Sequence, residues 1–96
     1  MPWVSNRTPH DITVSITKTS HVDGSDGDYT VKPKTYYAKG NPAAESTGTN
    51  YWVRYGPETL KVVVDGKEKT FQVEKDDHVN IYIDCYEIMA AKWGTF

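Results

Sequence analysis

The most regular hydrophobic pattern in the chain lies between residues 59 and 84, TLKVVVDGKEKTFQVEKDDHVNIYID. Apolar and polar residues alternate on both sides of Asp65-Gly66, a dipeptide that favours a two-residue hairpin turn because both positions need positive φ. A loop of two residues places Leu60 opposite Phe71. The pattern therefore predicts a β-hairpin, one face of which is formed by Leu60, Val62, Phe71 and Val73.

A third strand is predicted directly after this hairpin. Residues 74–77 form a polar turn, and Val79, Ile81 and Ile83 then alternate with polar neighbours. Alternation with a period of two is typical of a strand with one buried face. The same parity predicts that Cys85 points into the core.

Two further strands are predicted near the start of the chain. Residues 3–6 form a short strand that ends at the turn cluster 6–11, where Pro9 prevents its continuation. Residues 11–20 carry isoleucine and valine on one face and threonine and serine on the other, as a half-buried strand does. Residues 29–31 begin another short strand, and 35–38 continue it as an edge strand beyond Pro33.

The second half of the chain begins with residues 39–50, which contain no large apolar side chain and are expected to form a long surface loop. Residues 51–55, YWVRY, are predicted to be a strand, in which Val53 assigns Tyr51, Val53 and Tyr55 to the core. Residues 86–92 are predicted to add a last strand. One or two helical turns over 87–92 are the alternative, since Glu, Met, Ala and Lys favour helix.

Short strands that recur at turn spacings of about 8–12 residues predict an all-β fold, an antiparallel β-sandwich or small barrel of seven to eight strands. The 96 residues are expected to form a single domain, 1–96, with a thin core. The predicted core is Ile12, Val14, Ile16, Val53, Leu60, Val62, Phe71, Val73, Val79, Ile81 and Ile83.

Composition narrows the class of protein. An apolar fraction of 38% and a charged fraction of 25% are typical of a soluble globular chain, and no apolar run approaches the roughly 20 residues that span a bilayer. The net charge of −2 argues against a general nucleic-acid binder. A single cysteine excludes an internal disulfide, and the start of the chain shows no secretory pattern. We expect a cytoplasmic protein, or one exported without a signal peptide.

The aromatic content indicates a binding surface. Three Trp, seven Tyr and two Phe are more than a thin core requires. Several lie beside polar residues on either side of the 39–50 loop, a combination that suits a glycan or a lipid headgroup and equally a protein interface. The alternative is that Trp52 is covered by the loop or by a second subunit. The candidate ligand-binding residues are Tyr36, Tyr37, Asn50, Trp52, Arg54 and Glu58.

Metal binding and catalysis receive less support. Asp23, Asp26 and Asp28 cluster on a glycine-rich turn, as calcium ligands do, but their spacing does not match the EF-hand loop. We therefore expect no cofactor, with calcium as the minor alternative. His78 and Asp84 are predicted to point away from Cys85, so these three residues form no thiol triad. No nucleophile elbow, phosphate-binding glycine loop or zinc motif is present, and a non-enzymatic protein is expected.

Three segments resemble small single-domain β-sandwich proteins of mushroom-forming fungi: MPWVSNRTPHDITVSITKT, WVRYGPETLKV and KDDHVNIYID. The opening, a WV strand followed by asparagine, a polar turn and an alternating Ile/Val strand, is similar to that of aegerolysins. Those are fungal β-sandwich proteins that bind membrane lipids, and fungal fruit-body lectins use related sandwiches. This chain is shorter than either group. The resemblance implies a lectin-like, defence-related or lipid-binding protein and assigns no binding residue.

Three functions follow in order of expectation. The first is a lectin-like binding module for glycans. The second is a protein that binds membrane lipids through exposed aromatic residues such as Trp3 or Trp93. The third is a self-assembling structural protein, and a homo-oligomer is expected because a thin core leaves several strand edges open.

Overall fold

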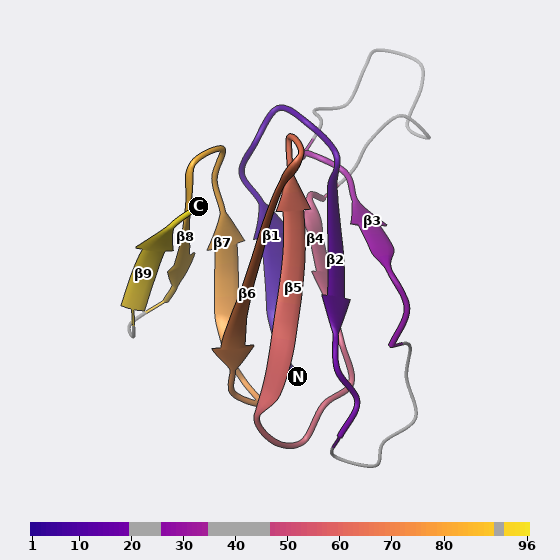
Figure 1. Cartoon of the computed structure of the whole chain (residues 1–96). Helices are drawn as coiled ribbons and strands as arrows, with labels where there is room; N and C mark the ends of the chain where they lie inside the picture. Colours follow the sequence, from indigo (N-terminus) through magenta and orange to yellow (C-terminus); the bar gives the residue numbers. More distant parts are fainter. Residues whose placement is uncertain (20–25, 35–46, 90–91) are drawn as a thin grey trace, which may run out of the picture.

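The computed structural model describes residues 1–19, 26–34, 47–89 and 92–96. These residues form an all-β sandwich of two packed sheets (Figure 1). Within them the strands are β1 (Trp3–Asn6), β2 (Ile12–Ile16), β3 (Tyr29–Val31), β4 (Thr49–Tyr51), β5 (Glu58–Val64), β6 (Lys67–Val73), β7 (His78–Ile81), β8 (Cys85–Ile88) and β9 (Lys92–Thr95).

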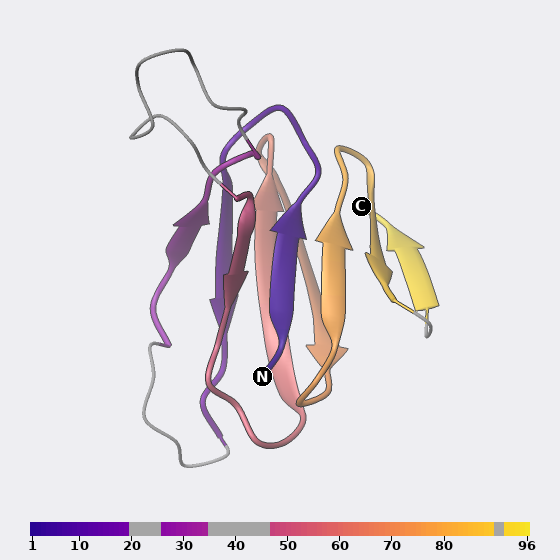
Figure 2. The same cartoon turned by 180° about the vertical axis from the view of Figure 1, so that it is seen from behind.

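One sheet has five strands in the order β4-β1-β7-β8-β9, and the other has four in the order β3-β2-β5-β6. Figure 2 shows the five-stranded sheet in front of the four-stranded one. Neighbouring strands are antiparallel with one exception, because β1 pairs with β7 in parallel. The predicted antiparallel sandwich is confirmed, with nine strands in the described residues rather than seven or eight.

The central hairpin has the predicted turn and register. Asp65 and Gly66 have φ of 49° and 79°, the positive values that let a two-residue turn follow the twist of its strands. Leu60 pairs with Phe71, and Val64 pairs with Lys67. The strands predicted at 3–6, 29–31 and within 11–20 are also present as β1, β3 and β2.

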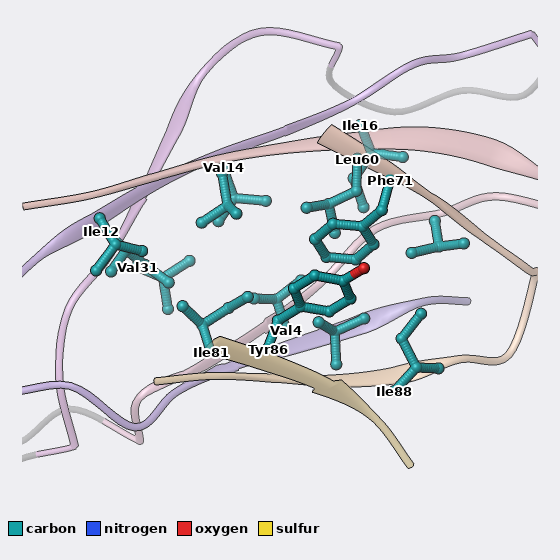
Figure 3. Close-up of a cluster of buried hydrophobic side chains, with 14 of the residues drawn as sticks. Val4, Ile12, Val14, Ile16, Val31, Leu60, Phe71, Ile81, Tyr86 and Ile88 are labelled. Carbon is teal, nitrogen blue, oxygen red and sulfur yellow. The ribbon is translucent and has the colours of Figure 1, made fainter. Parts of the chain in front are cut away.

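The core lies between the sheets and combines side chains from both (Figure 3). The rings of Phe71 in the four-stranded sheet and Tyr86 in the five-stranded sheet stack with centroids 3.9 Å apart and an interplanar angle of 2°. This contact joins the two sheets through large aromatic surfaces. Nine of the eleven predicted core residues are buried.

The other two predicted core residues are wrong. Ile83 is 39% exposed, because β7 ends at Ile81 and the chain turns, with the Tyr82 amide donating to the Cys85 carbonyl at 2.9 Å. The turn resets the alternation, so Tyr86 rather than Cys85 faces the core. Val53, the second error, is only half-buried because its segment is not a strand.

The predicted strand 51–55 is the largest error in the sequence interpretation. Strand β4 instead takes Thr49 and Asn50 from the predicted loop and ends at Tyr51. The Trp52 amide donates to the Pro2 carbonyl at 3.0 Å, and beyond this residue the chain leaves the sheet. Trp52 and Arg54 are therefore buried, whereas Tyr51 and Tyr55 are exposed, the reverse of the prediction.

The C-terminal segment forms two strands rather than one. Residues 85–88 and 92–95 are β8 and β9, and the helical alternative is wrong for the described residues of 87–92. The predicted edge strand 35–38 and most of the predicted loop 39–50 lie outside the described residues.

Gly94 marks a close approach between β9 and the aromatic core. A Cβ at this position would lie 2.7 Å from atoms of the Tyr86 ring, and that ring is already stacked on Phe71. We expect Gly94→Ala to lower the free energy of unfolding by about 1–3 kcal/mol, because the ring cannot withdraw. Urea unfolding of this variant, with Thr95→Ala as the control in the same strand, measures the effect. A midpoint equal to that of the control would contradict the assignment.

Candidate functional site

The two outer faces of the sandwich differ in chemistry. The outer face of the four-stranded sheet carries threonine, serine, lysine and glutamate, as a solvated sheet face does. The outer face of the five-stranded sheet carries large exposed aromatic residues at one end. This asymmetry makes the five-stranded sheet the candidate for binding.

Three neighbouring strands, β4, β1 and β7, and the residue that follows β8 contribute to one line of large side chains. Trp3 in β1 pairs with Tyr51 in β4 on one side and with His78 in β7 on the other. The Met89 amide donates to the His78 carbonyl at 3.0 Å, which adds the exposed Met89 to the line. Trp3 is 48% and Tyr51 59% exposed. We call Tyr51, Trp3, His78 and Met89 the aromatic row, which spans about 14 Å at the usual strand spacing.

The ring of His78 is fixed by hydrogen bonding. Its Nε2 lies 3.0 Å from Ser5 Oγ, which lies 3.0 Å from Thr49 Oγ1. The Trp3 ring meets the His78 ring at 71° with centroids 5.5 Å apart. The indole is therefore held against a ring that is itself anchored, and its free surface faces solvent. Such preorganisation reduces the entropy that a ligand must overcome.

A shallow hollow of about 350 Å³ lies beside the middle of the aromatic row, lined by Met1, Trp3, Asp76 and His78. At its rim the Met1 ammonium group lies 2.9 Å from Asp76 Oδ1. The hydrogen bond and the charge of this ammonium hold the pKa of Asp76 below its ordinary value. The rim therefore carries a compensated pair of charges.

A second line of side chains, here called the polar row, lies two residues further along the strands. It consists of Thr49, Ser5, Asn80 and Glu87, which are matched by the strand registers. Asn80 is buried, accepts a hydrogen bond from Arg7 Nε at 3.2 Å and donates one to Glu87 Oε1 at 3.0 Å. Asn80 thus fixes an exposed cation and an exposed anion on either side of itself.

Together the two rows have the chemistry of a polar-ligand site. Flat aromatic side chains offer large rigid surfaces for C–H faces, and a few placed polar groups orient the ligand. Ser5 and His78 also resemble a nucleophile and its base in distance, but Ser5 is buried and shares its hydroxyl with Thr49. That geometry suits anchoring of the ring.

The residues predicted from the sequence are not brought together at this site. Trp52 is only 4% exposed and packs edge-on against Tyr29, with ring centroids 6.1 Å apart. Arg54 is fully buried. The interpretation of both as exposed ligand contacts is therefore wrong. Tyr36 and Tyr37 lie outside the described residues.

Glu58 and Asn50 are also placed differently from the expectation. Glu58 is buried, and its Oε1 accepts hydrogen bonds from Thr17 Oγ1 at 2.7 Å, Thr19 Oγ1 at 2.8 Å and the Thr19 amide at 3.0 Å. This carboxylate therefore serves the fold. Asn50 is half-buried and lines a separate hollow of about 410 Å³ between β3 and β4.

The weak calcium candidates remain apart from any described cluster. Asp26 and Asp28 are exposed, and Asp23 lies outside the described residues. In the described part of the chain no three His, Cys, Asp or Glu side chains are arranged to hold a metal ion.

Cys85, His78 and Asp84 do not form a thiol triad. Cys85 lies opposite Tyr82, four positions from His78 and so about 13 Å away along the strand direction. Cys85 is half-buried on the outer face, not in the core as predicted. Burial and then the neighbouring Asp84 raise the pKa of its thiol above the ordinary value. The thiolate that a nucleophile requires is therefore disfavoured.

We expect Cys85 to react slowly with iodoacetamide near neutral pH. Because its pKa is raised, the rate should increase only as the pH rises past the ordinary thiol range. Asp84→Asn removes the adjacent negative charge and should shift the rate profile to lower pH. Mass spectrometry of the alkylated chain measures both profiles. A wild-type rate equal to that of the urea-unfolded chain throughout the pH range would contradict this expectation.

Comparisons with family models, curated proteins and solved structures found no match for this chain. Among the described residues, no helix is both long enough and apolar enough to cross a membrane. The geometry of the outer face is therefore the basis for assigning a function.

The aromatic and polar rows were not predicted from the sequence as one site. The sequence predicts Trp3 as a lipid contact, and it places His78, a rejected member of a thiol triad, with Asn80 on the polar face of a strand. The available signal is parity, since Trp3 and Ser5 share one face of β1, which Arg7 continues, and His78 and Asn80 share one face of β7. Their meeting depends on the parallel pairing of β1 with β7, whose paired residues are 75 positions apart in the sequence.

Proposed function

We propose that this protein is a non-enzymatic carbohydrate-binding module whose ligand lies on the outer face of the five-stranded sheet. One observation carries the proposal: the exposed Tyr51 and the exposed Trp3, which packs against the hydrogen-bonded His78 ring, lie directly beside a row of polar side chains. An indole and a phenol side by side can stack on the C–H faces of sugar rings. Thr49 and Glu87, the exposed members of the polar row, then offer a hydroxyl and a carboxylate to the hydroxyl groups of the sugar.

The lectin-like function expected from the sequence is thus kept, but its site moves. Trp52 and Arg54 are structural, and Trp3 and Tyr51 replace them as the aromatic contacts. A membrane-lipid surface is the second candidate, because Met1 and Met89 add exposed apolar side chains to the same end of the sheet. Trp and Tyr also favour the boundary between headgroups and acyl chains.

Self-association through the same face is the third candidate, and the homo-oligomer expected from the sequence belongs with it. Edge pairing through β6 is disfavoured, because Lys69 on this edge strand is half-buried. A charged residue that points inward on an edge opposes the addition of another strand.

A glycan array probed with the labelled protein tests the proposal, run once with calcium and once with chelator. We expect binding to one class of glycans in both conditions. Trp3→Ala and Tyr51→Ala should each lower the signal at least tenfold, equivalent to about 1.4 kcal/mol or more. Tyr55→Ala removes an exposed tyrosine that follows β4 outside the five-stranded sheet, and this variant should retain the wild-type signal.

Two results would contradict the carbohydrate proposal. A blank array together with sedimentation on phosphatidylcholine or phosphatidylserine vesicles would favour the lipid candidate. Equal loss of signal in Tyr55→Ala and Trp3→Ala would show that the aromatic row is not the contact. Loss of signal with chelator would instead bring Asp23, Asp26 and Asp28 back as calcium ligands.

A further inference from the structure

We infer that Arg7 and Glu87 form a two-sided clamp for adjacent hydroxyl groups of an uncharged sugar, a second subsite beside the aromatic row. The inference rests on the proposed carbohydrate-binding function and names the class of ligand. Arg7 directly follows β1, with its amide bonded to the Ile81 carbonyl at 2.8 Å, and Glu87 occupies the outer face of β8. Asn80 of β7 lies between them and bonds to both.

The clamp is defined by what Asn80 leaves available on each side. The Asn80 side chain bonds to Arg7 Nε and to Glu87 Oε1. Within the described residues, the terminal nitrogens of Arg7 and the Oε2 atom of Glu87 have no hydrogen-bond partner. Arg7 and Glu87 are both exposed. A guanidinium only donates and a carboxylate only accepts. Neighbouring sugar hydroxyls can satisfy both groups at once, because each hydroxyl both donates and accepts.

The position of the clamp suits a ligand of more than one sugar unit. Asn80 lies two residues beyond His78 on the same face of β7, which corresponds to about 7 Å along the strand. If one sugar ring stacks on Trp3, the next sugar unit of the ligand therefore lies near Asn80, between Arg7 and Glu87. The burial of Asn80 prevents the clamp from shifting without disturbing the sheet.

The charges of this face favour an uncharged ligand. Arg7 is balanced by Glu87, and the Met1 ammonium is balanced by Asp76. A carboxylate on the ligand would meet Glu87 as well as Arg7, so part of the attraction would be cancelled. An uncharged glycan is not repelled by Glu87, so none of its attraction to this face is cancelled.

The test is an array that carries neutral, sialylated and uronic-acid glycans, probed with the wild type, Arg7→Met and Glu87→Gln. The wild type should bind neutral glycans. In both variants the signal on neutral glycans should fall at least tenfold. Glu87→Gln should also gain signal on anionic glycans, because Arg7 then has no competing carboxylate beside it. Glu68→Gln, in β6 of the other sheet, is the matched control and should behave as the wild type.

The outcomes separate this inference from the proposed function. If the wild type binds neutral glycans and both variants bind within threefold of it, the clamp is wrong and the carbohydrate-binding function stands. If the wild type binds only anionic glycans, the clamp is again wrong. If no glycan is bound, the proposed function fails as well. The melting temperature of each variant distinguishes a loss of binding from a loss of fold.

Discussion

Arg54→Met is expected to lower the free energy of unfolding by about 3–5 kcal/mol, the range for removal of one partner from a buried charged network. Arg54 is fully buried. Its Nε donates to the Thr17 carbonyl at 2.7 Å, its Nη2 to the Ile16 carbonyl at 2.9 Å and its Nη1 to the Val53 carbonyl at 2.7 Å. Methionine fills a similar length but leaves these acceptors without their donor.

The prediction is measured by urea unfolding followed through tryptophan fluorescence. Lys67→Met is the matched control, because Lys67 is exposed and a surface change of this kind costs little. Arg54→Lys should also destabilise, since an ammonium group cannot reproduce the planar fork. Similar midpoints for Arg54→Met and Lys67→Met would show that the buried guanidinium does not hold the end of β2.

Asn6→Asp is expected to lower the free energy of unfolding by about 2–4 kcal/mol, because one change affects two buried hydrogen bonds. Asn6 Nδ2 donates to the His10 carbonyl at 2.7 Å and to the Val31 carbonyl at 2.8 Å. Its Oδ1 accepts from the Thr8 amide and hydroxyl at 2.9 and 2.7 Å. The aspartate would keep the acceptor but turn a second oxygen toward two carbonyl groups.

Thermal unfolding monitored by circular dichroism tests this prediction. The control is Asn50→Asp, in which an exposed hydrogen bond to the Tyr51 carbonyl is lost and little effect is expected. A melting temperature for Asn6→Asp equal to that of the control would contradict the role assigned to Asn6.

The same bonds explain why Asn6-Arg7-Thr8, although it fits the glycosylation pattern, is unsuited to carry a glycan in the folded protein.

The sequence predicted the parts of the fold that depend on neighbours along the chain. The hairpin followed from the turn at Asp65-Gly66, and the faces of β2, β5 and β6 followed from alternation. Alternation failed where a strand ended earlier than its pattern did. Ile83 continued the parity of β7 in sequence, but the turn at 82–84 had already reversed the chain.

The site could not be predicted in the same way, because contacts between distant segments decide it. Trp52 lies in a segment of aromatic and polar residues that is typical of a binding surface. It is nevertheless buried and packs against Tyr29, because the chain leaves the sheet after β4. Trp3 gains its significance only from the parallel pairing that places His78 beside it. Local pattern gives the face of each residue but not the strand that will lie next to it.

The most direct test of the proposed binding face is a titration of the protein with the glycan that gives the strongest array signal, followed through the backbone amide signals in an NMR spectrum. The proposal predicts the largest shifts at Trp3, Ser5, Tyr51 and Asn80, on strands β1, β4 and β7 of the five-stranded sheet. Signals from β2, β5 and β6 should change little. Shifts centred on the four-stranded sheet, or an array without any bound glycan, would contradict the proposal.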